Sequence, residues 1–168
     1  MKSLVTAIVA GCALAASGFA AQAASLVSGK KLEVNVNPDT LEKERLAYWD
    51  RFGPWCAIQD WHPAVKTCVE SKEGDDVYRT LTLQDGGVIK EKLVDKKDGM
   101  SYRYAIVESP LPVKNYTSTL RVREGSDGRA EVEWSSSFDP VGSADEAAKI
   151  VKGIYQAGLD NLNKMLGG

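Results

Sequence analysis

The feature that most constrains the fold is a long amphipathic run near the C-terminus, residues 143–166. Ser143-Ala-Asp-Glu146 has the spacing of a capping box, which satisfies free amide groups at a helix start. A helix over this range would be roughly 36 Å long at 1.5 Å per residue. Gly153 and Gly158 weaken such a helix, so we expect close approach of other atoms there or room left open. The expected apolar stripe is Ala147, Ile150, Val151, Ile154, Gly158, Leu162 and Met165.

The segment 65–138 supplies a surface for that helix, because apolar and polar residues alternate between glycine- and proline-containing turns. We predict about six antiparallel strands there and one more strand over residues 31–37. A short helix is expected from about residue 40 to 49, ending before Gly53-Pro54. The expected inward positions of the later strands are Tyr102, Tyr104, Ile106, Tyr116, Ser118, Leu120, Val122, Ala130, Val132, Trp134, Ser136 and Phe138.

One hairpin determines how two charged residues meet. A two-residue turn between 77–83 and 88–94 would mix apolar and polar faces, whereas a three-residue loop over 85–87 keeps the apolar sides together. That register places Arg79 and Glu91 diagonally on the inward face. Because a buried charge is costly unless matched, the pair is either a polar anchor for a ligand or a structural ion pair.

The segment FGPWCAIQDWHPAV, residues 52–65, gathers aromatic residues around Cys56 and the only histidine, His62. His62 is a candidate general base, but the sequence offers no carboxylate placed to orient it. One histidine and two cysteines do not match the ligand spacing of a known metal site, so we expect no metal and no cofactor. Cys56 and Cys68 are either a disulfide or two buried thiols.

The N-terminus has the layout of a secretory signal peptide: Lys2, an apolar stretch over residues 4–16, and Ala21-Gln22-Ala23. We expect cleavage after Ala23, a periplasmic or secreted location and one mature domain over residues 24–168, with no membrane span. A lipoprotein site at Cys12 is the alternative. Lys2 is removed with the expected signal peptide, so the mature protein would have 20 basic and 23 acidic residues and a net charge of −3. This negative charge disfavours nucleic acid as a partner.

Several short motifs occur in a recognisable order: Trp61-His-Pro-Ala-Val65, Arg79-Thr-Leu-Thr-Leu83 before Gly86-Gly87, Glu91-Lys-Leu93, Tyr102-Arg-Tyr104, Leu111-Pro-Val113, Glu131-Val-Glu-Trp134 and Gly158-Leu-Asp-Asn-Leu162. Together they resemble the START-like, or SRPBCC, superfamily and its polyketide cyclase/dehydrase-like group. Within that group they resemble exported MxaD-type proteins associated with bacterial methanol oxidation. The resemblance implies an α+β helix-grip fold, in which a curved antiparallel sheet of about seven strands wraps the C-terminal helix and encloses an apolar cavity.

We therefore expect an exported, non-enzymatic protein that binds a small hydrophobic or lipid-like ligand, or that assists a periplasmic redox system through a protein partner. The alternative is a cyclase/dehydrase- or hydrolase-type enzyme that uses polar groups in the cavity. No catalytic residue is assigned. The residues expected around the cavity are Phe52, Trp55, Trp61, His62, Arg79, Leu81, Glu91, Tyr104, Tyr116, Trp134, Phe138 and Tyr155.

Overall fold

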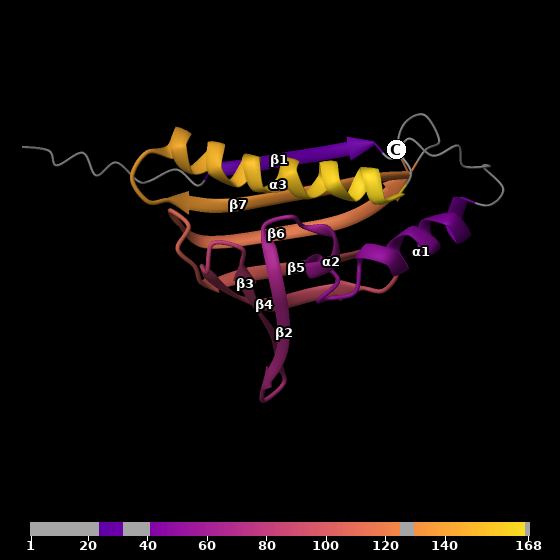
Figure 1. Ribbon diagram of the computed structural model, residues 1–168, viewed down its shortest axis with the longest axis horizontal. Coiled ribbons are helices and arrows are strands. Elements are labelled where there is room, and N and C mark those ends of the chain that lie inside the picture. Colours follow the sequence, from indigo (N-terminus) through magenta and orange to yellow (C-terminus); the bar gives the residue numbers. More distant parts are fainter. Residues whose placement is uncertain (1–23, 32–40, 125–129, 167–168) are drawn as a thin grey trace, which may run out of the picture.

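The computed structural model describes residues 24–31, 41–124 and 130–166 and contains one antiparallel sheet and three helices in that part of the chain (Figure 1). The strands lie in the order β1-β7-β6-β5-β4-β3-β2. The elements are β1 (Ala24–Lys31), α1 (Leu41–Phe52), α2 (Ile58–Trp61), β2 (Val65–Glu73), β3 (Asp76–Leu83), β4 (Val88–Lys97), β5 (Ser101–Glu108), β6 (Val113–Glu124), β7 (Ala130–Pro140) and α3 (Ala144–Leu166).

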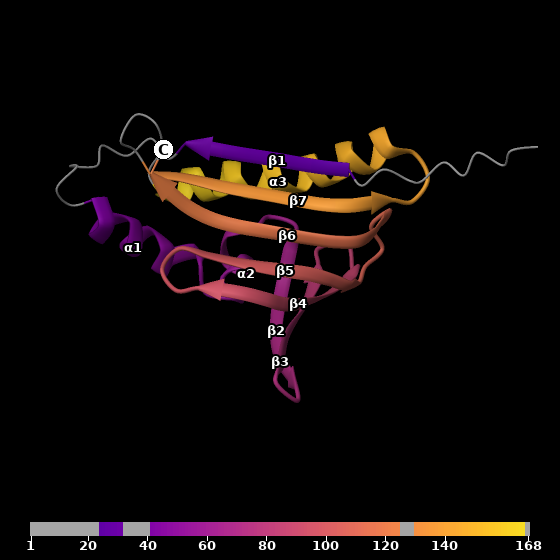
Figure 2. The same cartoon turned by 180° about the vertical axis from the view of Figure 1, so that it is seen from behind.

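Helix α3 runs along one face of the sheet beside β1 and β7, and Figure 2 shows the same sheet from its other side. Seven antiparallel strands and one long C-terminal helix confirm the predicted α+β helix-grip fold. No helix among the described residues is long and apolar enough to cross a membrane.

The N-terminal part of the described chain contains one strand that the sequence did not predict. The strand predicted over residues 31–37 falls, apart from Lys31, outside the described residues. The first described strand is β1, which pairs with β7 along its whole length. Helix α1 ends at Phe52, before Gly53-Pro54, as predicted, and the short helix α2 follows within the aromatic segment.

Alternation along β5, β6 and β7 is as predicted. The buried positions on the inner face include Tyr102, Tyr104, Tyr116, Ser118, Leu120, Val122, Ala130, Val132, Trp134, Ser136 and Phe138. On the outer face Arg121 pairs with Glu133 at 2.7 Å, and Arg123 pairs with Glu131 at 3.1 Å. The inner face therefore supplies the core, and the outer face carries partly exposed charge pairs.

The β3–β4 hairpin corrects the predicted register by two residues. Its loop is residues 84–86 rather than 85–87, and Arg79 lies directly opposite Glu91 instead of diagonally. The reason is Gly86, whose φ of +89° is the left-handed position that closes a three-residue loop. Gly87 therefore already belongs to the ladder and accepts a hydrogen bond from the Leu83 amide at 2.8 Å. A shift by two residues keeps the same side chains inward.

Helix α3 begins as predicted, because the Ser143 hydroxyl accepts a hydrogen bond from the Glu146 amide at 3.3 Å. The predicted apolar stripe is wrong at two positions: Ile150 and Met165 are 42% and 41% exposed. Their places on the buried face are taken by Tyr155, Leu159 and Leu166. Among these three, Tyr155 is held by the sheet, because its ring stacks on Trp134 with the ring centroids 4.3 Å apart.

Candidate functional site

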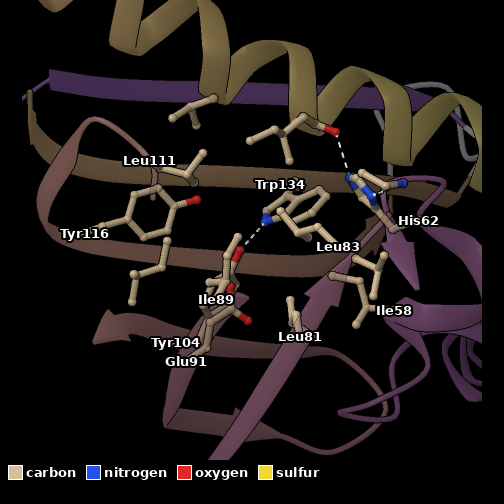
Figure 3. Close-up of a pocket in the computed structure, with 15 residues that line it drawn as sticks. Ile58, His62, Leu81, Leu83, Ile89, Glu91, Tyr104, Leu111, Tyr116 and Trp134 are labelled. Atoms are coloured by element: carbon tan, nitrogen blue, oxygen red, sulfur yellow. Dashed lines mark hydrogen bonds between the residues drawn. The ribbon is translucent and has the colours of Figure 1, made fainter. Parts of the chain in front are cut away.

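A small pocket of about 70 Å³ lies between α3 and the inner face of the sheet (Figure 3). Its walls are mainly aliphatic, and its polar groups come from His62, Glu91, Tyr104, Tyr116 and Trp134. His62 lies at the end of α2, and the other four come from β4, β5, β6 and β7. The pocket is therefore built from segments that are far apart in the sequence.

Six of the twelve residues expected around a cavity line this pocket: His62, Leu81, Glu91, Tyr104, Tyr116 and Trp134. Nine further lining residues did not appear in the sequence-based set: Ile58, Ala64, Val65, Leu83, Ile89, Ile106, Leu111, Val151 and Ile154. Strand alternation could have found Leu83 and Ile89, because they lie on the same inward faces as Leu81 and Glu91. The alternation could not have found Ile58 or Leu111, which lie on α2 and in the β5–β6 loop.

The remaining six expected residues pack elsewhere in the core: Phe52, Trp55, Trp61, Arg79, Phe138 and Tyr155. Aromatic contacts explain their positions. Phe52 packs on Trp49 with ring centroids 5.3 Å apart, and Phe138 stacks on Tyr116 at 6.0 Å. Trp61 meets Trp134 edge to face at 5.6 Å. Trp61 and Phe138 thus pack on Trp134 and Tyr116, two residues of the pocket wall, without lining the pocket themselves.

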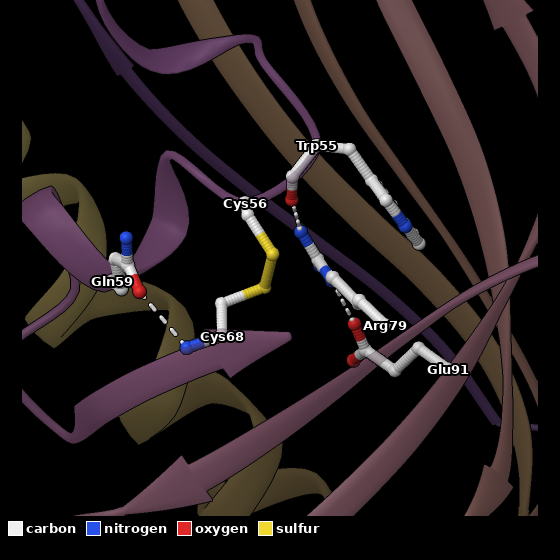
Figure 4. Close-up of a disulfide and its surroundings, with 6 residues drawn as sticks. All are labelled: Trp55, Cys56, Gln59, Cys68, Arg79 and Glu91. Atoms are coloured by element: carbon white, nitrogen blue, oxygen red, sulfur yellow. Dashed lines mark hydrogen bonds and ion pairs between the residues drawn. A yellow bond between two sulfur atoms is a disulfide. The ribbon is translucent and has the colours of Figure 1, made fainter. Parts of the chain in front are cut away.

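Arg79 is buried beneath residues 53–62, which we call the covering segment (Figure 4). Its Nε donates to Glu91 Oε2 at 2.6 Å, and its Nη1 donates to the Trp55 carbonyl at 2.5 Å. The guanidinium carbon lies 3.8 Å from the centre of the Trp55 ring, a cation–π geometry. Arg79 therefore ties the covering segment to the sheet and turns away from the pocket.

Burial acts on both charges of this pair. It opposes the positive charge of Arg79, but Glu91 and Tyr102 more than compensate and raise the pKa of Arg79 above its ordinary value. Burial raises the pKa of Glu91, and the neighbouring Arg79 acts in the opposite direction. Arg79 consequently remains a cation at neutral pH and supplies the counter-charge for Glu91.

His62 is held by hydrogen bonds at both ring nitrogens. Nδ1 accepts from the Ala64 amide at 3.2 Å, and Nε2 lies 3.0 Å from the carbonyl of Ile154 in α3 (Figure 3). Because an amide can only donate, we assign the ring hydrogen to Nε2, which then donates to Ile154. Burial lowers the pKa of His62, and the charge of Arg79 lowers it further, so the ring is neutral at pH 7. His62 thus fastens α3 to the start of β2.

Gly158 makes this attachment possible. A β-carbon at position 158 would lie 2.5 Å from His62 Cδ2 and 3.0 Å from the Trp61 ring. The close approach expected from the sequence therefore occurs at Gly158, whereas Gly153 faces open space. Asn161 adds a second link by donating to the Trp61 carbonyl at 2.9 Å.

A disulfide joins Cys56 of the covering segment to Cys68 of the edge strand β2, with Cα atoms 5.5 Å apart (Figure 4). Gln59 supports it, because its side-chain oxygen accepts from the Cys68 amide at 2.9 Å. The covering segment is therefore attached to β2 covalently and to β3 through Arg79.

The buried hydroxyls form a directed chain between sheet and helix. Ser118 Oγ donates to the Ser135 carbonyl at 2.7 Å, so it must accept from the Tyr155 hydroxyl at 2.9 Å. The hydroxyl of Tyr155 then accepts from Tyr116. Burial raises the pKa of both tyrosines, so both hydroxyls keep their hydrogens. The hydrogen of the Tyr116 hydroxyl is thus already used within the protein.

In the part of the chain that the structure describes, no group of three or more histidine, cysteine, aspartate or glutamate side chains is placed to hold a metal ion.

The sequence profile of the family described as polyketide cyclase/dehydrase and lipid transport matches residues 47–167, from α1 to the end of α3. The chain belongs to this family. The resemblance to the polyketide cyclase/dehydrase-like group of the SRPBCC superfamily is therefore confirmed.

Solved structures agree with the family. The protein XoxI from Bacillus cereus is 30% identical with a TM-score of 0.72, over 85% of this chain and 95% of that one. An uncharacterized protein from Bacillus thuringiensis is 31% identical with a TM-score of 0.73, and the match covers 85% of this chain and 98% of that one. The major latex-like protein 151 of Panax ginseng shares the fold, with 14% identity and a TM-score of 0.63, and the match covers 87% of this chain and 99% of that one. No curated protein matches the chain.

Proposed function

We propose that this protein is a non-enzymatic binding protein that holds a small, mainly apolar molecule between α3 and the sheet. The observation that carries the proposal is the pocket itself, with aliphatic walls and a few polar groups. Small-molecule sites in proteins typically have this composition. The family description, which includes lipid transport, supports a binding role of this kind.

The volume of the pocket limits the size of the ligand. Pockets for drug-sized ligands have volumes of roughly 300–1,000 Å³, whereas this pocket has a volume of about 70 Å³. An engineered apolar cavity of about 150 Å³ accepts benzene. The proposal is therefore a ligand of a few heavy atoms, and a lipid-like ligand would require α3 or the covering segment to move.

The environments of His62 and Arg79 favour binding over the enzymatic alternative. A general base needs a nitrogen free to accept the substrate proton, but Nδ1 of His62 already accepts from Ala64. Arg79 is fully buried and engages Glu91 and Trp55. Both side chains therefore have structural partners that a catalytic role would have to replace.

Xenon tests the proposal, because it is apolar, small enough for this pocket and visible through amide chemical shifts in NMR spectra. We expect saturable shifts around Leu81, Ile89 and Val151. Leu111→Trp, which fills the pocket from the β5–β6 loop, should abolish them. Val88→Trp is the matched control, because Val88 is 44% exposed and does not line the pocket. Shifts that persist in the Leu111 variant would refute the proposal.

We also propose that the protein is exported, with cleavage after Ala23, and assists a periplasmic redox system. The signal-like N-terminus and the Cys56–Cys68 disulfide support export, because disulfides persist in oxidising compartments. The similarity to XoxI supports the resemblance to MxaD-type proteins. Cell fractionation with N-terminal sequencing tests export, and a start other than Ala24 would contradict the cleavage site. Pull-down from periplasmic extract should recover a redox enzyme, and its absence would contradict the accessory role.

A further inference from the structure

We propose that small apolar molecules reach the pocket through the sheet itself, by way of a groove between the ends of β5 and β6. This inference rests on the proposed function of the pocket as a small-molecule site and adds the route by which a ligand enters it. Three observations carry it: the two strands separate, an open groove lies where they separate, and two residues line both the groove and the pocket.

Strands β5 and β6 separate before either of them ends. The ladder between them stops at Ala105 and Thr117, and in the described part of the chain no ladder pair joins residues 106–108 to residues 113–116. Beyond that point β5 continues to pair with β4, and β6 continues to pair with β7. The two strands therefore bound a gap in the sheet, which the loop over residues 109–112 closes at its far end.

A β-bulge in each strand accounts for the separation. In β5 the register with β4 shifts at Val107, and in β6 the register with β7 shifts at residues 115–116. Bulges bend a strand and locally disrupt its ladder. Asn115 has a left-handed φ of +49°, and its side chain donates to Asp139 Oδ2 at 2.7 Å, which fixes the bulge of β6 to β7. The gap is therefore a feature of the backbone and not of side-chain positions.

An open groove of about 800 Å³ lies at this gap, and both strands line it, over residues 105–109 and 113–117. Two of its lining residues, Ile106 of β5 and Tyr116 of β6, also line the internal pocket. The groove on the outside and the pocket on the inside therefore meet at one residue from each strand.

Ile106 is the side chain that can open this wall. Tyr116 is fixed, because its hydroxyl is hydrogen-bonded to Tyr155 and its ring stacks on Phe138 with the centroids 6.0 Å apart. Ile106 is only partly buried, and its aliphatic side chain is held by packing alone. Side chains of this kind change rotamer far faster than helices or strands move. We therefore assign Ile106 as the gate between groove and pocket.

The other walls of the pocket are fastened more firmly. Helix α3 is attached through hydrogen bonds of His62 and Asn161. The covering segment is attached through the disulfide and through Arg79, which donates to the Trp55 carbonyl. A ligand that entered beside α3 or under the covering segment would have to break such bonds, whereas the gap between β5 and β6 has no ladder pairs to break. Entry through the gap therefore disturbs the fold least.

The experiment measures how fast xenon exchanges between the pocket and water, by xenon saturation-transfer NMR on the folded protein. Ile106→Ala removes the gate and should raise the exchange rate about tenfold, because the rate depends exponentially on the barrier to passage. Ile89→Ala is the matched control, because it makes the same change in a pocket residue that does not line the groove. It should leave the exchange rate nearly unchanged.

A second pair of variants blocks the groove from outside. Val107 is 51% exposed and lines the groove but not the pocket, so Val107→Trp should slow exchange about tenfold, by raising the barrier, and leave the xenon affinity unchanged. Val88→Trp is its control, because Val88 is 44% exposed and lines neither cavity. Both positions are exposed, so this comparison decides the question even if the Ile106 variant does not fold.

Each contrary result has its own meaning. If Ile89→Ala accelerates exchange as much as Ile106→Ala, xenon enters through general fluctuations of the fold, and the proposed route is wrong while the binding function stands. If reduction of the disulfide accelerates exchange and Val107→Trp does not slow it, entry lies under the covering segment and the route is again wrong. If the unaltered protein shows no saturable xenon binding, the proposed function fails and the route fails with it.

Discussion

The imidazole of His62 packs so closely on Gly158 that a β-carbon at position 158 would lie 2.5 Å from its Cδ2 atom. This contact brings the ring to the Ile154 carbonyl and fastens α3 to the start of β2. The histidine that the sequence singles out for chemistry therefore has a structural role in this fold.

Replacing Gly158 by alanine should destabilise the protein. Alanine favours a helix by roughly 1 kcal/mol over glycine, but the new β-carbon would displace the rings of His62 and Trp61. Overpacking of this kind costs about 1–3 kcal/mol, so we expect a net loss of up to about 2 kcal/mol in urea unfolding. Gly153→Ala is the matched control, because position 153 faces open space and should gain stability. Equal effects of the two substitutions would contradict the contact.

Stability should fall as the pH drops below about 6.5, the ordinary pKa of histidine. The pKa of His62 is lowered in the folded protein, chiefly by burial. The unfolded chain therefore binds the proton first, and acid favours unfolding. The loss should begin near pH 6.5 and continue until the folded-state pKa is reached. Unfolding in urea between pH 4 and pH 8 measures it. His62→Gln should remove this component, and an unchanged pH slope in that variant would show that another group is responsible.

Replacing Arg79 alone should destabilise the folded protein more than replacing both Arg79 and Glu91. Arg79→Met leaves Glu91 buried without its counter-charge, which typically costs about 3–5 kcal/mol. The double substitution Arg79→Met with Glu91→Leu should recover most of that loss, because an apolar pair can replace a buried ion pair. A double-mutant cycle of unfolding free energies measures the coupling. If the losses simply add, the two side chains act independently.

Reduction of the Cys56–Cys68 disulfide should lower stability by about 2–3 kcal/mol, as expected for a short loop, since the cysteines are 12 residues apart. The rate of amide hydrogen exchange should increase mainly in the covering segment, because reduction removes the covalent link between this segment and β2. A variant with serine at both positions should behave like the reduced protein and should not respond to a reductant. Faster exchange throughout the sheet instead would show that the bond stabilises the whole fold.

The sequence predicts those parts of the fold that follow from local periodicity. Alternation placed Tyr104 and Trp134 inward, and the capping box placed the start of α3 at Ser143. The β3–β4 register was wrong by two residues, because the decisive factor was which of two adjacent glycines adopts the left-handed conformation. Tyr155 was absent from the helix stripe but was expected at the cavity, and the structure buries it by stacking its ring on Trp134.

The site was harder to predict than the fold. Residues such as Glu91 and Tyr104 follow from strand alternation once a helix-grip fold is expected. Ile58 and Ile154 reach the pocket through the packing of α2 and α3, which no local pattern encodes. The partners of His62 are equally remote, since the Ile154 carbonyl lies 92 residues away along the chain. Such contacts arise from tertiary packing, and sequence spacing does not specify them.

The most direct test of the central claim is a crystal structure of the protein pressurised with xenon. The proposed binding function predicts one ordered xenon atom between α3 and the sheet, in contact with Leu81, Ile89 and Val151. A pocket that stays empty at saturating pressure, or that side chains fill, would contradict the claim that this protein holds a small apolar molecule there.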